Sequence, residues 1–156
     1  MKFKNVDLSL KQQDYVETIF TLSRVHKHAH TKTIADTLGI KMASVSEAVR
    51  GLAEKGIVKY RPRKNITLTA LGRDIAMELE KRHSALADFF QNILGCSEGK
   101  SEEIACKVEH VIDEEFRVRL SEFAYFLRHE LASEDGKDPL EVFRKRYKLQ
   151  CSDDEE

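Results

Sequence analysis

The sequence is poor in the residues that are typical of several protein classes. It has no Trp, two Pro and seven Gly among 156 residues, which excludes collagen, Gly/Pro-rich linkers and most small β-sandwiches. No apolar run approaches the roughly 18 residues of a membrane span, and no signal peptide is visible at the amino terminus. Three Cys argue against a disulfide framework and for a reducing compartment. We therefore expect a globular cytoplasmic protein with no membrane partner.

The net charge of −1 conceals a strong asymmetry along the chain. Residues 1–70 contain 13 Lys/Arg and 6 Asp/Glu, a balance of +7, whereas residues 71–156 contain 13 and 21, a balance of −8. A basic half is suited to a phosphate backbone, and an acidic half to cations or to solubility. Chance is the alternative explanation. Residues 151–156 read as a solvated acidic tail.

Hydrophobic periodicity predicts three helices in the basic half. Ser9 and Gln12 form a capping box before the first helix. Thr31 is expected to cap the second helix, and Gly39 to end it. A short helix, a tight Gly turn and a further helix are typical of a helix-turn-helix. The predicted helices cover residues 10–25, 32–38 and 43–55.

Two short β-prone runs, 57–60 and 66–69, flank a basic turn. This pattern predicts a hairpin. A basic hairpin after a helix-turn-helix is typical of a wing, whose charges reach phosphate or the minor groove. A plain surface hairpin is the alternative.

Two sets of residues are candidates for DNA contacts. On the third helix, Glu47 could accept from a cytosine amino group or repel phosphate. Neutralising the wing residue Arg63 should weaken binding to every sequence and flatten its salt dependence. The groove-facing candidates are Ser44, Ser46, Glu47 and Arg50, and the phosphate candidates are Lys32, Lys41, Arg61, Arg63 and Lys64.

The acidic half is predicted to be all helix. Thr69 is expected to cap a long helix to about residue 93, and Ser101 to open another to about residue 112. Further helices are expected over 113–131 and 139–146. Their wide apolar faces predict a homodimer. The predicted fold is therefore mainly α, with a winged-helix DNA-binding domain at 1–71 and a helical dimerisation domain at 72–150, to which the metal-type side chains described next would add metal binding.

Three groups of metal-type side chains lie far apart in the sequence. Cys106, Glu109 and His110 have the spacing i, i+3 and i+4, so one helical face offers S, O and N to an ion. The other groups are Asp14 with Glu17 on the first helix, and His83 on the long helix. Each group also has a purely structural alternative. Asp14 and Glu17 could be a solvated surface pair, His83 a hydrogen-bonded core histidine, and Cys106 a small buried residue.

His26, His28 and His30 are a further cluster of imidazoles. They form either a second metal site or simply a His-rich turn leading into the second helix, and we favour the turn.

Several segments resemble the DtxR/MntR family of metal-dependent bacterial repressors. The resemblance covers about residues 8–135. The matching segments are DYVETIF at 14–20 (family D-Y-x-E-x-I-Y), TIADTL at 33–38 with SVS at 44–46, LTALG at 68–72 (L-T-x-x-G), KRH at 81–83 (R-H), and ACKVEHV at 105–111 (A-C-x-x-E-H-V).

The resemblance implies a function and a ligand set. A divalent metal would act as corepressor of a homodimer that binds a palindromic double-stranded DNA operator and regulates metal-ion homeostasis genes. The metal would fix the two domains relative to each other. The implied ligands are Asp14, Glu17, His83, Cys106, Glu109 and His110.

The chain departs from both branches of that family. Cys106 stands where the manganese branch usually has Glu, and Asp14 where the iron branch usually has Met. Ala87 replaces a Glu of the iron branch's ancillary site, and we expect the short architecture without a third, SH3-like domain. The thiolate favours softer ions, whereas three carboxylates favour Mn²⁺. We therefore expect Fe²⁺ or Mn²⁺ physiologically, with tight Zn²⁺ binding in vitro.

Other functions remain as alternatives. A winged-helix regulator could sense an organic ligand or an oxidant through Cys106. A metal-buffering protein would not need a basic wing. A helical metalloenzyme would keep an open metal position, but no H-E-x-x-H, nucleophile–base pair or Gly-rich phosphate loop is found, so we expect no enzyme.

Overall fold

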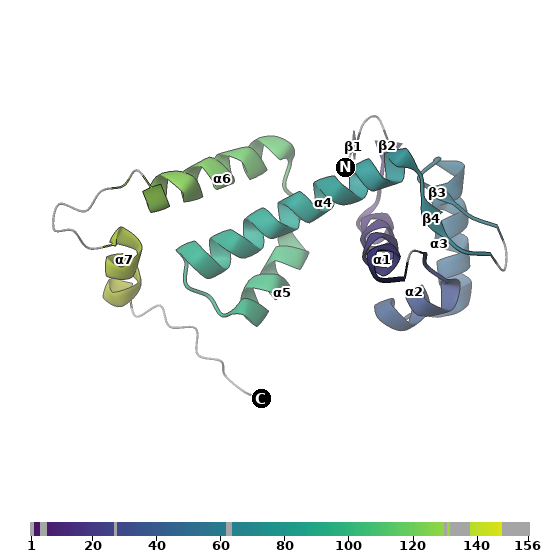
Figure 1. Cartoon of the computed structure of the whole chain (residues 1–156), viewed down its shortest axis with the longest axis horizontal. Coiled ribbons are helices and arrows are strands. Elements are labelled where there is room, and N and C mark those ends of the chain that lie inside the picture. The colour runs from purple at the N-terminus through teal and green to yellow at the C-terminus, as the bar shows by residue number, and fades with distance from the viewer. Residues whose placement is uncertain are drawn as a thin grey trace. The chain divides into compact units, whose positions relative to one another are not determined.

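The structure is a computed structural model that describes residues 2–3, 6–26, 28–61, 64–129, 131 and 138–147 (Figure 1). The fold is mainly helical, as predicted. Two compact units divide at residue 80, inside the long helix: Met1–Glu80 and Lys81–Glu156. Arg63 and the acidic tail at 151–156 lie outside the described residues. None of the described helices combines the length and the apolar character needed to cross a bilayer.

The amino-terminal unit contains the predicted helix-turn-helix and wing. Val58 pairs with Leu68 and Lys59 with Thr67 in an antiparallel hairpin, which confirms the wing. A second small hairpin, at the amino terminus, was not predicted. The elements are β1 Lys2–Phe3, β2 Val6–Asp7, α1 Leu10–His26, α2 Thr31–Leu38, α3 Met42–Glu54, β3 Val58–Lys59, β4 Thr67–Leu68 and the first half of α4 Ala70–Asp88.

Local side chains set the helix boundaries of this unit. The Ser9 N–H donates to Gln12 Oε1 (3.2 Å) and the Gln12 N–H to Ser9 Oγ (3.3 Å), which confirms the capping box. Gly39 ends α2 in the left-handed conformation at φ 64°. The prediction for Thr31 is wrong, because His30 is the N-cap and Thr31 is the first helical residue. At the start of α2, the side-chain hydroxyl that hydrogen-bonds to the His30 backbone is that of Thr33.

The start of α4 is fastened to the wing by Thr69 and Gly72. The Thr69 hydroxyl donates to the carbonyl oxygens of Gly56 (2.7 Å) and Ile57 (3.0 Å) as alternatives, and it accepts from the Gly72 N–H at 3.0 Å. Gly72 is buried, and a Cβ there would overlap the Ile57 carbonyl. The L-T-x-x-G segment is therefore explained by close packing between α4 and the wing strand.

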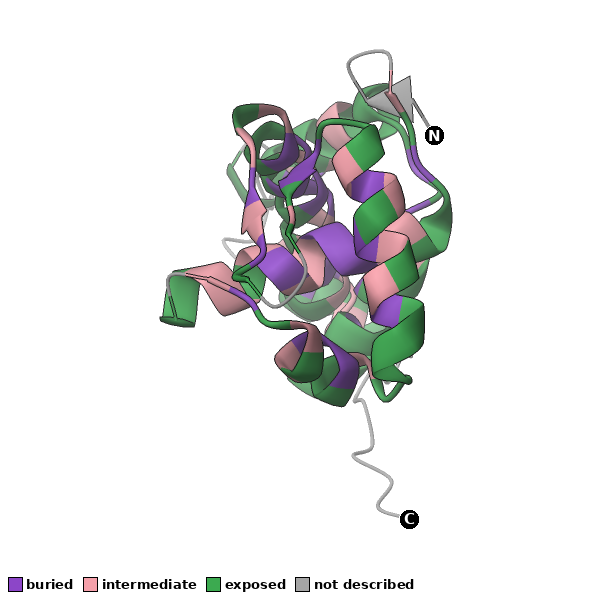
Figure 2. Ribbon diagram, turned by 90° about the vertical axis from the view of Figure 1, so that its right-hand side faces the viewer, coloured by how far each residue is buried: buried purple, intermediate pink, exposed green. Residues whose placement is uncertain are grey.

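One continuous hydrophobic core fills the amino-terminal unit. It joins α1, α2, α3, the wing and the first half of α4, and buried positions recur along the helices at core-facing intervals (Figure 2). Ile19, Leu52 and Ile57 are fully buried within it. This unit thus has a single core of its own.

The carboxy-terminal unit consists of the rest of α4 and the elements that follow it. The predicted long helix does reach residue 93, but its last turn is a π-helix in which the Leu94 N–H donates to the Phe89 carbonyl at 3.1 Å. The elements are η1 Phe89–Ile93, α5 Glu98–Val108, α6 Glu114–His129 and α7 Pro139–Tyr147.

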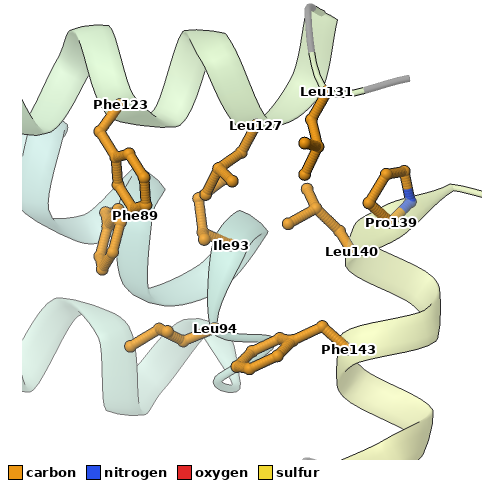
Figure 3. A pocket seen from close by; sticks show the side chains of 9 residues that line it. All are labelled: Phe89, Ile93, Leu94, Phe123, Leu127, Leu131, Pro139, Leu140 and Phe143. Carbon is orange, nitrogen blue, oxygen red and sulfur yellow. The ribbon is translucent and has the colours of Figure 1, made fainter. Parts of the chain in front are cut away.

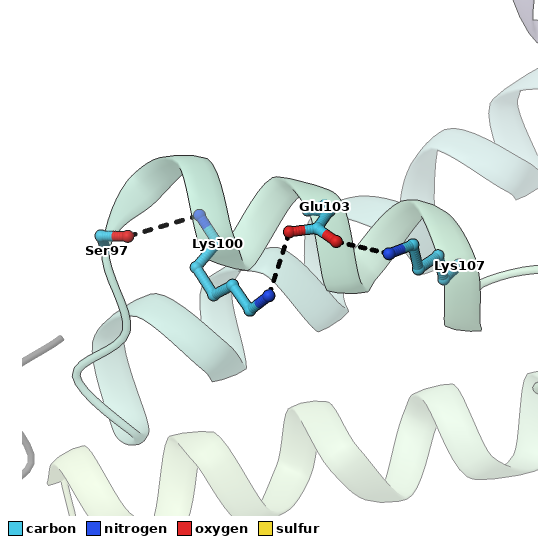
Figure 4. A network of polar contacts seen from close by, with 4 residues as sticks. All are labelled: Ser97, Lys100, Glu103 and Lys107. Atoms are coloured by element: carbon cyan, nitrogen blue, oxygen red, sulfur yellow. Dashed lines mark hydrogen bonds and ion pairs between the residues drawn. The ribbon is translucent and has the colours of Figure 1, made fainter. Parts of the chain in front are cut away.

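Helix α5 begins earlier than predicted. Ser97, not Ser101, is its N-cap, and its hydroxyl accepts from the Lys100 N–H at 3.4 Å (Figure 4). Ser101 is buried instead. On the exposed side, Lys107 and Lys100 flank the Glu103 carboxylate and lower its pKa to about 2. The helix ends at Val108, although the Glu109 N–H still donates to the Ala105 carbonyl at 2.9 Å.

The core of the carboxy-terminal unit is divided and incomplete. One small cluster centres on Leu86 and Ala105, and another on Ile93 and Leu140. A pocket of about 300 Å³ adjoins the second cluster (Figure 3). It is lined by Phe89, Ile93, Leu94, Phe123, Leu127, Leu131, Pro139, Leu140 and Phe143.

Candidate metal centre

Three of the predicted ligands meet in the carboxy-terminal unit. His83, on α4, places Nδ1 2.9 Å from Oε2 of Glu109. His110 places Nε2 3.7 Å from the other oxygen of the same carboxylate. Glu109 therefore stands between two imidazoles from different elements, as the end of α5 and the middle of α4 pack together.

The backbone that supports these ligands is held by a buried cation. Arg82, 5% exposed, donates from Nη1 to the Ile112 carbonyl at 3.0 Å. This bond ties α4 to the turn that follows His110. Arg82 therefore positions the turn, while the next residue along α4, His83, faces Glu109.

The electrostatics of the cluster favour a cation at this place. Glu109 is only 2% exposed, and its Oε2 accepts no well-aligned hydrogen bond from the described residues despite the short distance to His83. The Glu109 carboxylate and, to a lesser degree, Glu102 raise the pKa of His83 to about 9 against the opposing effect of burial. Without metal, the imidazolium supplies the charge that a buried carboxylate requires.

The donor set fits a divalent transition metal. Two imidazoles and a buried carboxylate are ligands that Zn²⁺, Fe²⁺ and Mn²⁺ all accept. A metal bound here would replace the proton of His83 as the countercharge of Glu109.

Glu102 was missed by the sequence analysis. Its Oε2 lies 2.7 Å from Nε2 of His83. Its spacing could have identified it as a member of the cluster, because residue 102 lies one turn before Cys106 and two turns before Glu109, on the same helical face. Glu102 is exposed, and its carboxylate contacts the ring nitrogen of His83 that does not face Glu109.

The remaining predicted ligands have different surroundings. Cys106 is exposed on the last turn of α5, whereas Glu109 and His110 are buried beyond the end of that helix. Asp14 and Glu17 belong to the other unit, where they lie half-buried one turn apart on α1. Between them, burial raises the pKa of Tyr15, and the charges of Asp14 and Glu47 raise it further.

The candidate DNA contacts lie at the surface of the amino-terminal unit. Ser46 is partly exposed, and its hydroxyl donates to the Met42 carbonyl at 3.0 Å, which leaves its oxygen able to accept. Arg63 is not among the described residues. The other candidates, Lys32, Lys41, Ser44, Glu47, Arg50, Arg61 and Lys64, are exposed.

Two family profiles together match most of the chain. The iron-dependent repressor amino-terminal DNA-binding domain matches residues 7–66, and the iron-dependent repressor metal-binding and dimerisation domain matches residues 69–136. The chain belongs to the iron-dependent repressor family. It is thus a member of a family of metal-dependent, DNA-binding transcriptional regulators, and the predicted boundary at residue 71 falls close to the junction of the two profiles.

Individual relatives agree with this assignment. A helix-turn-helix regulator of Methanocaldococcus jannaschii is 32% identical over 117 residues, 74% of this chain and 94% of the relative. The transcriptional regulator MntR of Escherichia coli is 32% identical over 102 residues, 65% of each chain. A solved manganese-dependent transcriptional repressor in complex with manganese matches with TM-score 0.68 and 29% identity over 82% of this chain. This chain spans 61% of that structure and about two thirds of MntR.

Proposed function

We propose that the chain represses metal-ion homeostasis genes and that a divalent metal is its corepressor. The observation that carries the proposal is the buried Glu109 carboxylate between His83 and His110, in a chain whose other unit is a winged helix. Manganese or iron is the proposed physiological metal, with Zn²⁺ binding tightly in vitro.

Each proposed ligand has a distinct task. Glu109, His83 and His110 hold the ion on the carboxy-terminal unit, and Cys106 joins them from the preceding turn of α5. The bound ion supplies positive charge that several anionic ligands share. Asp14 and Glu17 on α1 are proposed to complete its coordination.

The proposed switch follows from ligands that belong to two units. Without metal, Asp14 and Glu17 repel the other carboxylates, whereas an ion bound by both sets stabilises one arrangement of the units. If DNA binds that arrangement better, metal and DNA raise each other's affinity by the same factor. Repression would then follow metal concentration.

DNA binding further requires two copies of the chain. We propose that α6 forms the dimer interface, because it carries exposed aromatic side chains that a second copy would cover. Phe123 is 51% exposed and Tyr125 is 58% exposed. A dimer would set two α3 helices one DNA turn apart, as a palindromic operator requires.

The deciding experiment measures binding of the full chain to DNA from its own promoter region. Titrations are run with chelator and with Mn²⁺, Fe²⁺ or Zn²⁺. We expect strong binding only with metal. Equal affinity under all conditions would refute the corepressor role, and metal binding without any DNA binding would indicate a buffering protein.

A second candidate function rests on the exposure of Cys106. An exposed thiol beside a metal centre is a target for oxidation, and its loss as a ligand would release DNA. Peroxide should then abolish DNA binding by the wild type but not by Cys106→Glu. Identical sensitivity of both proteins would reject this function.

A further inference from the structure

Three histidines surround a hollow that the proposed function does not use. His26, His28 and His30 line it together with Thr33, and its volume is about 370 Å³. It lies where α1 ends and α2 begins, entirely within the amino-terminal unit. Among the described residues, neither a carboxylate nor an ammonium group lines this hollow.

The backbone pairing of Ala29 directs two of the imidazoles to the same side. Ala29 exchanges two hydrogen bonds with Ile66 at the base of the wing, at 3.1 and 2.8 Å, and its side chain is buried in the core. Neighbours of a strand residue project to the opposite face. His28 and His30 accordingly lie outside, with ring centroids 4.8 Å apart in an edge-to-face contact.

Hydrogen bonds hold the backbone beneath these rings. The Thr33 hydroxyl accepts from the His30 N–H at 3.1 Å and donates to the His30 carbonyl at 2.8 Å. The His30 backbone is extended, at φ −116° and ψ 151°. The imidazoles thus extend from a fixed base, while their exposure leaves rotation about the side-chain bonds open.

We infer that His26, His28 and His30 form a second metal site, selective for Zn²⁺ and similar borderline ions. Imidazole nitrogens suit Zn²⁺, Ni²⁺ and Cu²⁺, whereas a site without carboxylates is poor for Mn²⁺. The carboxyl end of α1, at His26, favours a cation. The ligand nitrogens of these three described imidazoles do not all lie within 4.8 Å of one another. Binding therefore draws them together by side-chain rotation.

The test counts ions bound to the full chain. Equilibrium dialysis with Zn²⁺ is expected to show one ion fewer per chain in His28→Ala/His30→Ala than in the wild type, with at least a tenfold loss of affinity, about the least that removing a ligand costs. The Mn²⁺ count should not change. His129→Ala removes an exposed imidazole elsewhere and is the matched control.

A second measurement needs no variant. In the wild type, Zn²⁺ should shift the imidazole NMR signals of His26, His28 and His30 together. The same shifts should persist in Glu109→Gln, whose proposed metal centre is damaged, so that this site is tested independently of the corepressor proposal.

Two results would overturn the inference. One is an unchanged Zn²⁺ count in the double variant. The other is Zn²⁺ that leaves the three ring signals of the wild type unmoved.

Discussion

The two units bury their side chains in different ways. The amino-terminal unit has one core that runs through α1, α2, α3 and the wing. The carboxy-terminal unit has two small clusters, buries the charged residues Arg82 and Glu109, and exposes aromatic side chains such as Tyr125. The first unit is thus organised round a single core of its own. We infer that the second is completed by an ion and by a second copy of the chain.

The largest effect should come from disturbing the core of the amino-terminal unit. Gly72→Ala places a methyl group against the Ile57 carbonyl and should lower the free energy of unfolding by about 3 kcal/mol or more. Gly51→Ala is the matched control, because a Cβ there meets nothing within 4 Å and should stabilise α3 by about 0.5–1 kcal/mol. Urea unfolding followed by circular dichroism measures both. Equal changes would refute the close-packing explanation.

The next largest effect concerns the proposed ion. Glu109→Gln should weaken Mn²⁺ binding about 100-fold, because it removes the charge of a buried ligand while keeping its shape. Glu103→Gln, on the exposed side of α5, should have no effect. Calorimetric titration measures both constants. A Glu109→Gln variant with wild-type affinity would exclude Glu109 as a ligand.

The proposed dimer surface on α6 should be sensitive to the loss of an exposed aromatic side chain. Phe126 on α6 is 42% exposed. Phe126→Ser is expected to raise the dimer dissociation constant about 30-fold. Met77→Ser makes a similar change at an exposed apolar residue of α4 in the other unit, and should leave it unchanged. Sedimentation equilibrium decides between these outcomes. If both variants behave alike, α6 is not the interface.

A smaller effect is expected on metal preference. Cys106→Glu should shift the ratio of Zn²⁺ to Mn²⁺ affinity about tenfold toward Mn²⁺, since a carboxylate is the harder ligand. Cys96→Ser controls for the loss of a thiol. An unchanged ranking in competition titrations would show that the thiolate does not select the metal.

The smallest effect concerns the wing. Lys64→Ala should weaken binding to all DNA sequences a few-fold and reduce the salt slope by about one. Lys100→Ala removes the same charge from the other unit and should preserve the slope. Fluorescence anisotropy at several salt concentrations measures it. A preserved slope in Lys64→Ala would remove this residue from the interface.

Much of the fold was predictable because its signals are local. Capping at Ser9, the left-handed Gly39 and the antiparallel pairing of the two β-prone runs are all confirmed. The start of α5 was not, because Gly99 interrupts the helical pattern and Ser101 imitates a cap. The unpredicted first hairpin pairs only two residues on each side, too few for a visible alternation.

The candidate site was predictable in its residue types but not in its environments. Sequence spacing placed Cys106, Glu109 and His110 on one helical face. Helix α5, however, ends at Val108, so the chain turns there and buries Glu109 and His110 while Cys106 stays exposed. Likewise, the role of Glu102 depends on His83, which is 19 residues away.

The sequence by itself determined the winged helix, the helical second unit and the inventory of possible ligands, because periodicity, capping and charge are encoded within a few residues. Only the tertiary structure decided which of the possible ligand side chains are buried away from solvent. It buries Glu109 between His83 and His110, and it pairs Ala29 with Ile66 so that His28 and His30 share one face. Burial and juxtaposition arise from packing between distant segments, and these decide whether a carboxylate or an imidazole becomes a site.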